Sequence, residues 1–289
     1  MSSPRVWHIS GANTGLGLEL ALKAIDEGDH VIAAVRSPHK VPDTLKRPEV
    51  KVLQFDLSWS QEQMDAYAKE AFDAFGKVDV LVNNAGYAYM GAIEESEDSA
   101  VKAQFDTNVF AMLRIIRASL PYFRKQKSGL IMNLSSVGGM RGYPTNGIYC
   151  ATKFAVEGFT EALAAEVAPF GINCVIVQPG YFRTAFLSNP SSGANIAPAL
   201  EVYKGTPADD ARQALEKYNG RQPGDPKKGA ARMWEYGAGA GMFSDKKKLL
   251  RLPLGSDSGA IMKELSGTLA DTASAYEDVW KSTDFPVGM

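Results

Sequence analysis

Tyr149 and Lys153 form a residue pair that could move a proton. They lie four positions apart in a segment with a helical pattern, so both side chains are expected on one face of a helix. A phenol with a pKa of ~10 exchanges protons poorly at neutral pH, whereas an adjacent lysine ammonium would stabilise the phenolate and lower that pKa. The pair therefore predicts that Tyr149 acts as a general acid and base. The same spacing also arises by chance on exposed helices, so the prediction depends on what surrounds the pair.

Two further polar residues could complete such a site. Ser136 follows the strand expected over residues 129–135, at the edge where open α/β sheets bind their ligands. Its hydroxyl could donate a hydrogen bond to a substrate oxygen, while Ser135 is expected to cap a turn. Asn108 lies inside the helix expected over residues 100–123, where an amide is a mediocre helix former. We expect Asn108 to mark either a backbone distortion or water site that holds Lys153, or a surface amide.

A glycine-rich turn far upstream predicts a nucleotide site. Gly11, Gly15 and Gly17 join the strand expected over residues 6–10 to the helix expected over residues 19–27. Glycines at such a turn let backbone N–H groups approach a pyrophosphate at the helix N-terminus. The spacing is GxxxGxG rather than GxGxxG, and glycine-rich turns also occur by chance, so the position after the first strand carries the inference.

Arg36 and Ser37 favour NADP over NAD. An acidic residue about 20 positions past the glycine turn would hold the ribose of NAD. Here the strand expected over residues 31–35 contains no Asp or Glu and is followed by Arg36, whose guanidinium suits a 2′-phosphate. The alternative is a solvated surface arginine. Asp56, after the strand expected over residues 50–55, would either meet the adenine amino group or cap a loop.

The order of the remaining elements predicts an α/β fold. Nearly continuous apolar runs alternate with helical patterns, as expected for a Rossmann-type, doubly wound parallel sheet of about seven strands in three layers. We expect one domain over residues 1–289, in which residues 181–248 form a loop and helix insert that covers the substrate. The other expected strands are 78–83, 172–177 and 249–254, the other helices are 61–75, 149–167, 208–218, 228–236 and 258–281, and 188–205 is expected to be a loop.

Composition excludes several classes of protein. A net charge of −2, with 45% hydrophobic and 22% charged residues, is ordinary for a soluble globular protein and indicates no nucleic-acid partner. No signal peptide and no run of some ~18 apolar residues is visible, so we expect a cytoplasmic protein without a membrane partner. Cys150 and Cys174 are the only cysteines, and we expect buried free thiols and no metal site.

Aromatic residues after the late strands predict an apolar substrate pocket. Its expected wall is formed by Tyr87, Tyr143, Tyr181, Phe182 and Phe186. This composition favours a hydrophobic, ring-bearing ketone or alcohol over a sugar phosphate. Some of these side chains could instead belong to the core.

Seven motifs in this order resemble those of the short-chain dehydrogenase/reductase family, in its non-extended branch, from Val6 to about Leu254. They are Ser10 to Gly17, Asp56-Leu57, Asn83 to Gly86, Asn108, Ser136, Tyr149 to Lys153, and Pro179-Gly180 with Thr184. The chain departs from the family pattern at Ser10, where threonine is commoner, and at Gln178, where asparagine is frequent.

The resemblance implies roles for these positions. Asn108, Ser136, Tyr149 and Lys153 would be the catalytic tetrad. The cofactor would contact Gly11, Asn13, Thr14, Gly15, Leu16, Gly17, Asp56, Leu57, Asn83, Ala85 and Gly86, with Pro179, Gly180 and Thr184 near the nicotinamide. Family members also form homodimers or homotetramers through the helices expected to start near residues 100 and 149.

Together these residues predict an NADP(H)-dependent oxidoreductase. The hydride would move between nicotinamide and a carbonyl or secondary alcohol, with Tyr149 as the proton donor or acceptor. Two alternatives remain open from the sequence: an NADP-binding redox sensor or scaffold without turnover, and an epimerase or dehydratase that works through transient oxidation.

Overall fold

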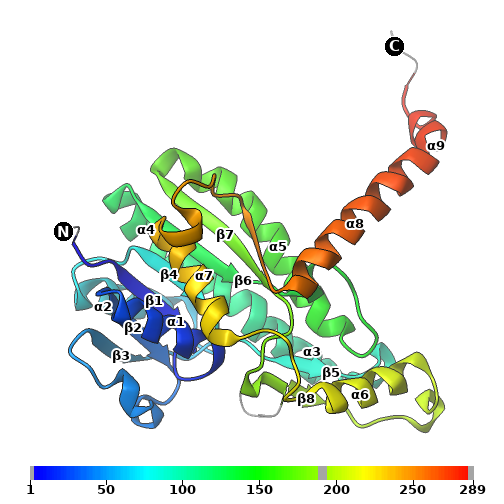
Figure 1. Cartoon of the computed structure of the whole chain (residues 1–289), viewed down its shortest axis with the longest axis horizontal. Helices are drawn as coiled ribbons and strands as arrows, with labels where there is room; N and C mark the ends of the chain where they lie inside the picture. Colours follow the sequence, from blue (N-terminus) through cyan, green and yellow to red (C-terminus); the bar gives the residue numbers. More distant parts are fainter. Residues whose placement is uncertain (1–2, 188–193, 286–289) are drawn as a thin grey trace.

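The computed structural model describes residues 3–187 and 194–285. Its centre is a sheet of seven parallel strands in the order β3-β2-β1-β4-β6-β7-β9 (Figure 1). The strands are β1 (Val6–Ser10), β2 (His30–Val35), β3 (Val50–Gln54), β4 (Val80–Asn83), β6 (Gly129–Leu134), β7 (Ile172–Pro179) and β9 (Arg251–Leu254). The order reverses between β1 and β4, and that reversal creates a crevice at the carboxyl ends of the strands. The predicted parallel α/β sheet is confirmed.

Helices cover both faces of the sheet and make three layers. One face carries α1 (Gly15–Asp26) and α7 (Pro226–Ala238) over a core that includes the fully buried Trp7. The other carries α2 (Gln61–Ala74), α4 (Ala111–Gln126) and α5 (Gly147–Val167) over a second core that includes Phe123. Because strands β1, β4 and β6 are buried on both faces, their sequences are mostly apolar rather than alternating. Cys150 and Cys174 are buried free thiols, as predicted.

The predicted insert between β7 and β9 covers the site only in its first part. Asp29 accepts hydrogen bonds of 2.9 Å from the indole nitrogens of both Trp7 and Trp234. This buried carboxylate attaches α7 to the first strands of the sheet, and α7 packs along α1. The later half of the segment 181–248, expected as an insert over the substrate, thus contributes a helix to one layer of the core.

The helix predicted over residues 100–123 is interrupted. It consists of α3 (Asp98–Phe105), a π-helical turn over Asp106–Phe110, and α4. π-Helical turns inside longer helices mark local distortions that frequently lie at functional sites. The interruption contains Asn108, in agreement with the expected backbone distortion there.

A small second sheet was not anticipated. β5 (Ala88–Met90) pairs in parallel with β8 (Ala194–Ile196), inside a segment predicted to be a loop. Residues 188–193 of that predicted loop lie outside the described residues. Three-residue strands carry too little periodicity to be recognised in a sequence. The pairing leads the chain into α6 (Pro207–Tyr218), which lies beside the same edge of the molecule (Figure 1).

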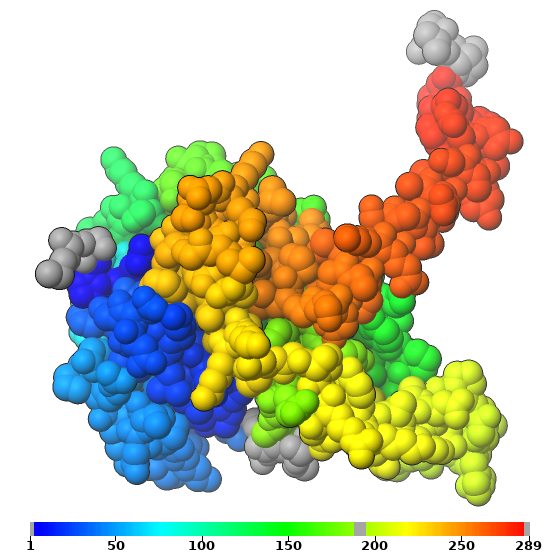
Figure 2. Space-filling view, viewed as in Figure 1, coloured from blue at the N-terminus to red at the C-terminus, as the bar shows by residue number. Residues whose placement is uncertain are grey.

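The C-terminal helices project from the body of the molecule (Figures 1 and 2). α8 (Ser256–Ala275) and α9 (Glu277–Lys281) replace the single helix predicted over residues 258–281. The first turn of α8 is attached to the body, since Ser258 donates a 2.7 Å hydrogen bond to the Gln178 carbonyl. Every residue after Leu265 in these helices is exposed. No helix in the described parts of the chain is long and apolar enough to cross a membrane.

Candidate active site

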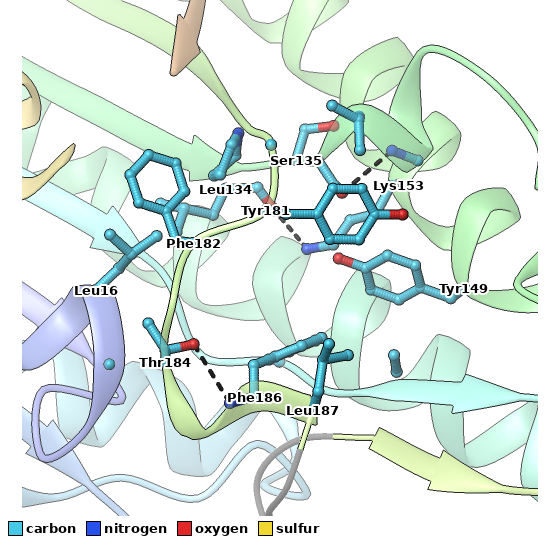
Figure 3. Close-up of a pocket in the computed structure, with 18 of the residues that line it drawn as sticks. Leu16, Leu134, Ser135, Tyr149, Lys153, Tyr181, Phe182, Thr184, Phe186 and Leu187 are labelled. Carbon is cyan, nitrogen blue, oxygen red and sulfur yellow. Dashed lines mark hydrogen bonds between the residues drawn. The ribbon is translucent and has the colours of Figure 1, made fainter. Parts of the chain in front are cut away.

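A cavity of about 280 Å³ lies where strands β1, β4, β6 and β7 end (Figure 3). It brings together most of the predicted site residues. They are Gly11, Asn13, Thr14, Gly15, Leu16, Ala85, Gly86, Ser136, Tyr143, Tyr149, Lys153, Pro179, Gly180, Tyr181, Phe182, Thr184 and Phe186. The predicted site residues that do not line it are Gly17, Arg36, Ser37, Asp56, Leu57, Asn83, Tyr87 and Asn108.

The glycine turn is shaped as a phosphate cradle. Gly11 and Gly15 have positive φ angles of 68° and 56°, a conformation that favours glycine. A Cβ at Gly17 would lie 2.5 Å from the Gly11 carbonyl oxygen, so this glycine permits a close turn rather than contacting a ligand. Thr14, the N-cap of α1, makes no side-chain capping bond. The first N–H groups of α1 are thus free of side-chain caps and face the cavity, as anion binding requires.

Asn84 is a residue of this site that the sequence analysis missed. Its amide nitrogen donates a 2.8 Å hydrogen bond to the Ser10 carbonyl, and its backbone N–H donates to the Ser10 hydroxyl at 3.0 Å. Asn83, predicted in its place, is buried and donates instead to Asn133 on the neighbouring strand at 2.8 Å. Successive residues of a strand point to opposite faces, and this alternation is the signal that could have separated the two asparagines.

Arg36 and Asp56 lie at the adenosine end, beyond the cavity. Arg36 is exposed directly after β2 and makes no hydrogen bond or ion pair with any described residue. Asp56 accepts hydrogen bonds from the backbone N–H and the hydroxyl of Ser58, at 2.9 and 2.8 Å. One oxygen of Asp56 therefore caps a loop, which was the alternative to an adenine contact.

Tyr149 and Lys153 project from the first turns of α5 into the cavity (Figure 3). The Lys153 ammonium lies 5.6 Å from the centre of the Tyr149 ring and donates a 2.7 Å hydrogen bond to the Leu134 carbonyl. Burial lowers the pKa of Lys153 to about 8. Burial also raises the pKa of Tyr149, and hydrogen bonding with Ser136 only opposes that rise. The predicted lowering of the Tyr149 pKa by Lys153 is therefore wrong for the protein alone, because desolvation of the phenol dominates.

Asn108 connects the end of the β4–β5 segment to α5. Its amide nitrogen donates to the Tyr87 carbonyl at 2.9 Å and to the Thr152 hydroxyl at 3.2 Å, and its amide oxygen accepts from the Tyr87 N–H at 3.2 Å. Thr152 precedes Lys153 in α5. The surface alternative is excluded, since Asn108 is almost completely buried. The Asn108 side chain thus supplies hydrogen-bond partners for the backbone N–H and carbonyl of Tyr87, which lie next to the interruption of the helix.

The far end of the cavity is apolar and uncharged. Ala88 and Met90 of β5 pack against Phe186, Leu187 and Leu215 beside the Tyr149 ring. The centres of the Tyr149 and Phe186 rings lie 6.3 Å apart. Lys153 is the only lysine, arginine, aspartate or glutamate among the described residues that line the cavity.

Tyr87, predicted to form part of this wall, does not line the cavity. Its backbone N–H and carbonyl are instead bound by Asn108 through the two hydrogen bonds described above. Among the described residues no group of three or more His, Cys, Asp or Glu side chains could hold a metal ion.

Comparisons with known proteins agree with this arrangement. Residues 5–194 match the family model of the short chain dehydrogenases. The chain belongs to this family. A relative over almost the whole chain is the oxidoreductase BOA17 of Botryotinia fuckeliana (strain B05.10), 32% identical over 96% of this chain and 97% of that protein. The 3-ketodihydrosphingosine reductase of Bacteroides thetaiotaomicron is 39% identical over 64% of this chain and 67% of that protein.

A solved structure extends the likeness to three dimensions. A short-chain dehydrogenase from Streptomyces avermitilis is 34% identical and superposes with a TM-score of 0.87, over 98% of this chain and 100% of that one. The Rossmann-type fold inferred above is therefore shown by structure as well as by sequence.

In this short-chain dehydrogenase a buried carboxylate supports the catalytic elements. Glu157, one turn after Lys153 in α5, accepts hydrogen bonds from the Ser135 hydroxyl at 2.7 Å and the Gln178 amide at 2.8 Å. It also pairs with Arg251 of β9 at 3.2 Å. Glu157 thus joins α5 to the ends of β6, β7 and β9. The sequence analysis missed it, and expected Ser135 to cap a turn instead.

We expect Glu157→Ala to lower kcat about tenfold or more and the free energy of unfolding by about 2–4 kcal/mol. Two buried donors lose their acceptor, at ~1–3 kcal/mol each, and Ser136 and Lys153 lose the support that positions them. NADPH affinity, measured by fluorescence titration, should change less than kcat because the glycine turn is untouched. Glu157→Gln keeps the shape and one acceptor and should recover much of kcat.

Glu161→Ala is the matched control. Glu161 lies one turn further along α5 and pairs with the same Arg251 at 3.2 Å, but its side chain is 58% exposed against 9% for Glu157. An exposed ion pair contributes only ~0–1 kcal/mol. Equal effects of the two substitutions on kcat per folded molecule would show that Glu157 does not position the site.

Proposed function

We propose that this short-chain dehydrogenase is an NADP(H)-dependent oxidoreductase that transfers hydride between nicotinamide and a carbonyl or secondary alcohol. The observation that carries the proposal is the convergence of Ser136 from the end of β6 with Tyr149 and Lys153 from α5 in one cavity, with an otherwise uncharged wall. Ring-bearing, hydrophobic ketones fit that wall better than phosphorylated sugars, since an unpaired phosphate would lose its hydration there.

The proton chemistry follows from the surroundings of Tyr149. With its pKa raised by burial, Tyr149 stays protonated at neutral pH and acts as the acid in reduction. Ser136, which lines the same cavity as Tyr149, holds the substrate oxygen beside the phenol. Lys153 stabilises the phenolate that forms once the proton has left. This stabilisation lowers the free-energy barrier of the reaction more than it changes the free energy of the resting enzyme, in which the phenol is still protonated. The Leu134 carbonyl and the Asn108–Thr152 contacts keep Lys153 and its helix turn in place.

Several features of the chain suit NADP. The uncapped N-terminus of α1 and the turn at Gly11 and Gly15 would hold the pyrophosphate. Arg36, exposed and without a hydrogen-bond or ion-pair partner in the described part of the chain, would hold the 2′-phosphate through charge-assisted hydrogen bonds. The bound dinucleotide supplies the hydride. Two solved structures that share the fold at 23% identity contain NADP and NAD, so the proposed preference depends on Arg36 rather than on the fold.

The direction proposed is reduction of a ketone. One relative is named as a reductase of a 3-keto compound. The assignment of the whole chain to one domain, a homodimeric or homotetrameric assembly, a small molecule as the partner and a cytoplasmic location remain proposals from the sequence.

A substrate panel tests the function. NADPH consumption should be followed by absorbance with acetophenone-type, steroid-like and aliphatic ketones, and with a keto-sugar phosphate. We expect kcat/KM to be at least about tenfold higher for the ring-bearing ketones than for the sugar phosphate. Tight NADPH binding without turnover of any ketone, or of any alcohol with NADP, would favour a redox sensor. Conversion of a substrate without net change in NADPH would favour an epimerase or dehydratase.

A further inference from the structure

A second cavity of about 290 Å³ adjoins the first. The two cavities share four lining residues, Tyr143, Asn146, Tyr181 and Leu215. The second is bounded further by Pro144 and by residues of α6, and Tyr149 lines only the first. Because the cavities share these residues they lie side by side, and we refer to the two together as a trough.

From this trough we infer the substrate class of the proposed site: an elongated, uncharged carbonyl compound with an apolar tail. The inference rests on the proposed function, because the reacting carbonyl is placed at Tyr149. The head occupies the first cavity, and the tail passes between Tyr143 and Leu215 into the second.

The lining of α6 has the pattern of an apolar binding face. Ala211, Ala214, Leu215 and Tyr218 line the second cavity. Their spacing of three, four and seven positions places them on one side of the helix. No charged residue of the same helix lines either cavity, and Glu216 and Lys217 are exposed. An ionised tail would therefore meet no countercharge in the second cavity.

α6 is held in place by a buried ion pair, so the trough is a built feature of the fold. Arg212 donates to Glu95, whose side chain is 0% exposed. Glu95 also accepts a 2.9 Å hydrogen bond from the Leu200 N–H and a 2.6 Å hydrogen bond from the Ala92 N–H. One carboxylate thereby joins the segment after β5, the segment after β8 and the middle of α6. Because Arg212 neighbours Ala211, this anchor fixes the part of α6 that lines the second cavity.

The junction between the two cavities carries a polar group. The buried Tyr143 hydroxyl has no hydrogen-bond partner among the described residues. The Tyr181 ring meets the ring of Tyr218, the last residue of α6, edge to face with centres 5.2 Å apart. Because the Tyr143 hydroxyl is itself buried, it offers no accessible polar group to a chain that passes between the cavities. An apolar tail therefore needs no hydrogen-bonding group of its own at this point.

A series of acetophenones with para-alkyl chains from methyl to octyl tests the inference. In the wild type, kcat/KM with NADPH should rise about three- to fourfold per methylene once the chain enters the second cavity. That factor corresponds to ~0.8 kcal/mol per buried CH₂. In Ala211→Trp and Ala211→Asp the rise should disappear, while acetophenone itself keeps its kcat/KM within about twofold. Glu216→Trp, on the outer side of α6, should retain the wild-type dependence.

Direct binding separates this inference from the proposed function. Para-octylphenyl ethanol and phenyl ethanol are titrated by calorimetry into wild type and Ala211→Trp without cofactor. Tighter binding of the octyl compound to the wild type alone supports the tail site even if no ketone is turned over, in which case the proposed function fails. Turnover with the same chain-length dependence in the Ala211 variants and the wild type overturns the tail site and leaves the function standing.

Discussion

Replacing Tyr149 with phenylalanine should lower kcat for ketone reduction about a thousandfold, within the ~10²–10⁴ range of general acid–base catalysis, and leave NADPH affinity within about twofold. The substitution removes one hydroxyl and retains the ring that packs near Phe186. Ser136 cannot replace the lost acid, because an aliphatic hydroxyl is a far weaker acid than a phenol. Steady-state absorbance and a fluorescence titration of NADPH measure the two quantities.

Tyr181→Phe is the control for this prediction. Tyr181 lines the same cavity, so the control removes an equivalent hydroxyl that we give no part in proton transfer. Its kcat for a short ketone should stay within about threefold of wild type. If Tyr149→Phe also retains activity within a few-fold, the role of Tyr149 as the acid is wrong.

Replacing Arg36 with aspartate should reverse the cofactor preference, with a change of about a hundredfold or more in the ratio of NADPH to NADH affinity. The loss of hydrogen bonds to a charged phosphate costs ~1.5–3 kcal/mol, and the new carboxylate repels the phosphate while accepting hydrogen bonds from the ribose hydroxyls of NADH. Arg36 is exposed and makes no hydrogen bond or ion pair with another described residue, so the fold should be unaffected. Titration of both dinucleotides against protein fluorescence gives the ratio.

Arg124→Asp makes the same change of charge on the exposed surface of α4, remote from the glycine turn. It should leave both affinities nearly unchanged at moderate salt, because exposed charges beyond the ~8–10 Å Debye length are screened. Equal affinities for NADPH and NADH in the wild type, or a ratio that Arg36→Asp does not alter, would contradict the assignment of NADP.

The sequence was sufficient for the sheet and for the pairing of Tyr149 with Lys153. Buried parallel strands must be apolar on both faces, so their runs stand out, and glycines at positive φ terminate or turn the chain between them. Helical spacing alone places Lys153 beside Tyr149. Ser136 could be placed in the same site because it follows a strand, and the carboxyl ends of parallel strands lie at one edge of the sheet. These features depend on neighbours within a few residues or on a general rule of the fold.

Short or interrupted elements could not be predicted in the same way. The π-helical turn at Asn108 and the three-residue strands β5 and β8 gain their stability from distant partners, such as Tyr87 for Asn108 and Ile196 for Met90. Such long-range contacts produce no local periodicity of apolar residues in the sequence. The choice between Asn83 and Asn84 depends on which side of β4 each points to, and this follows only from where the strand ends.

The chemistry of Tyr149 shows the same division. Residue types and spacing determined that a phenol, an ammonium and a hydroxyl would meet, and that an arginine follows the second strand. Only the tertiary structure decided the depth of burial, which raises rather than lowers the pKa of the phenol. It also decided that Glu157 joins α5 to three strands and that Arg212 anchors α6 on Glu95, 117 positions away. Desolvation and long-range ion pairs are properties of packed surfaces, and they exist only after the chain has folded.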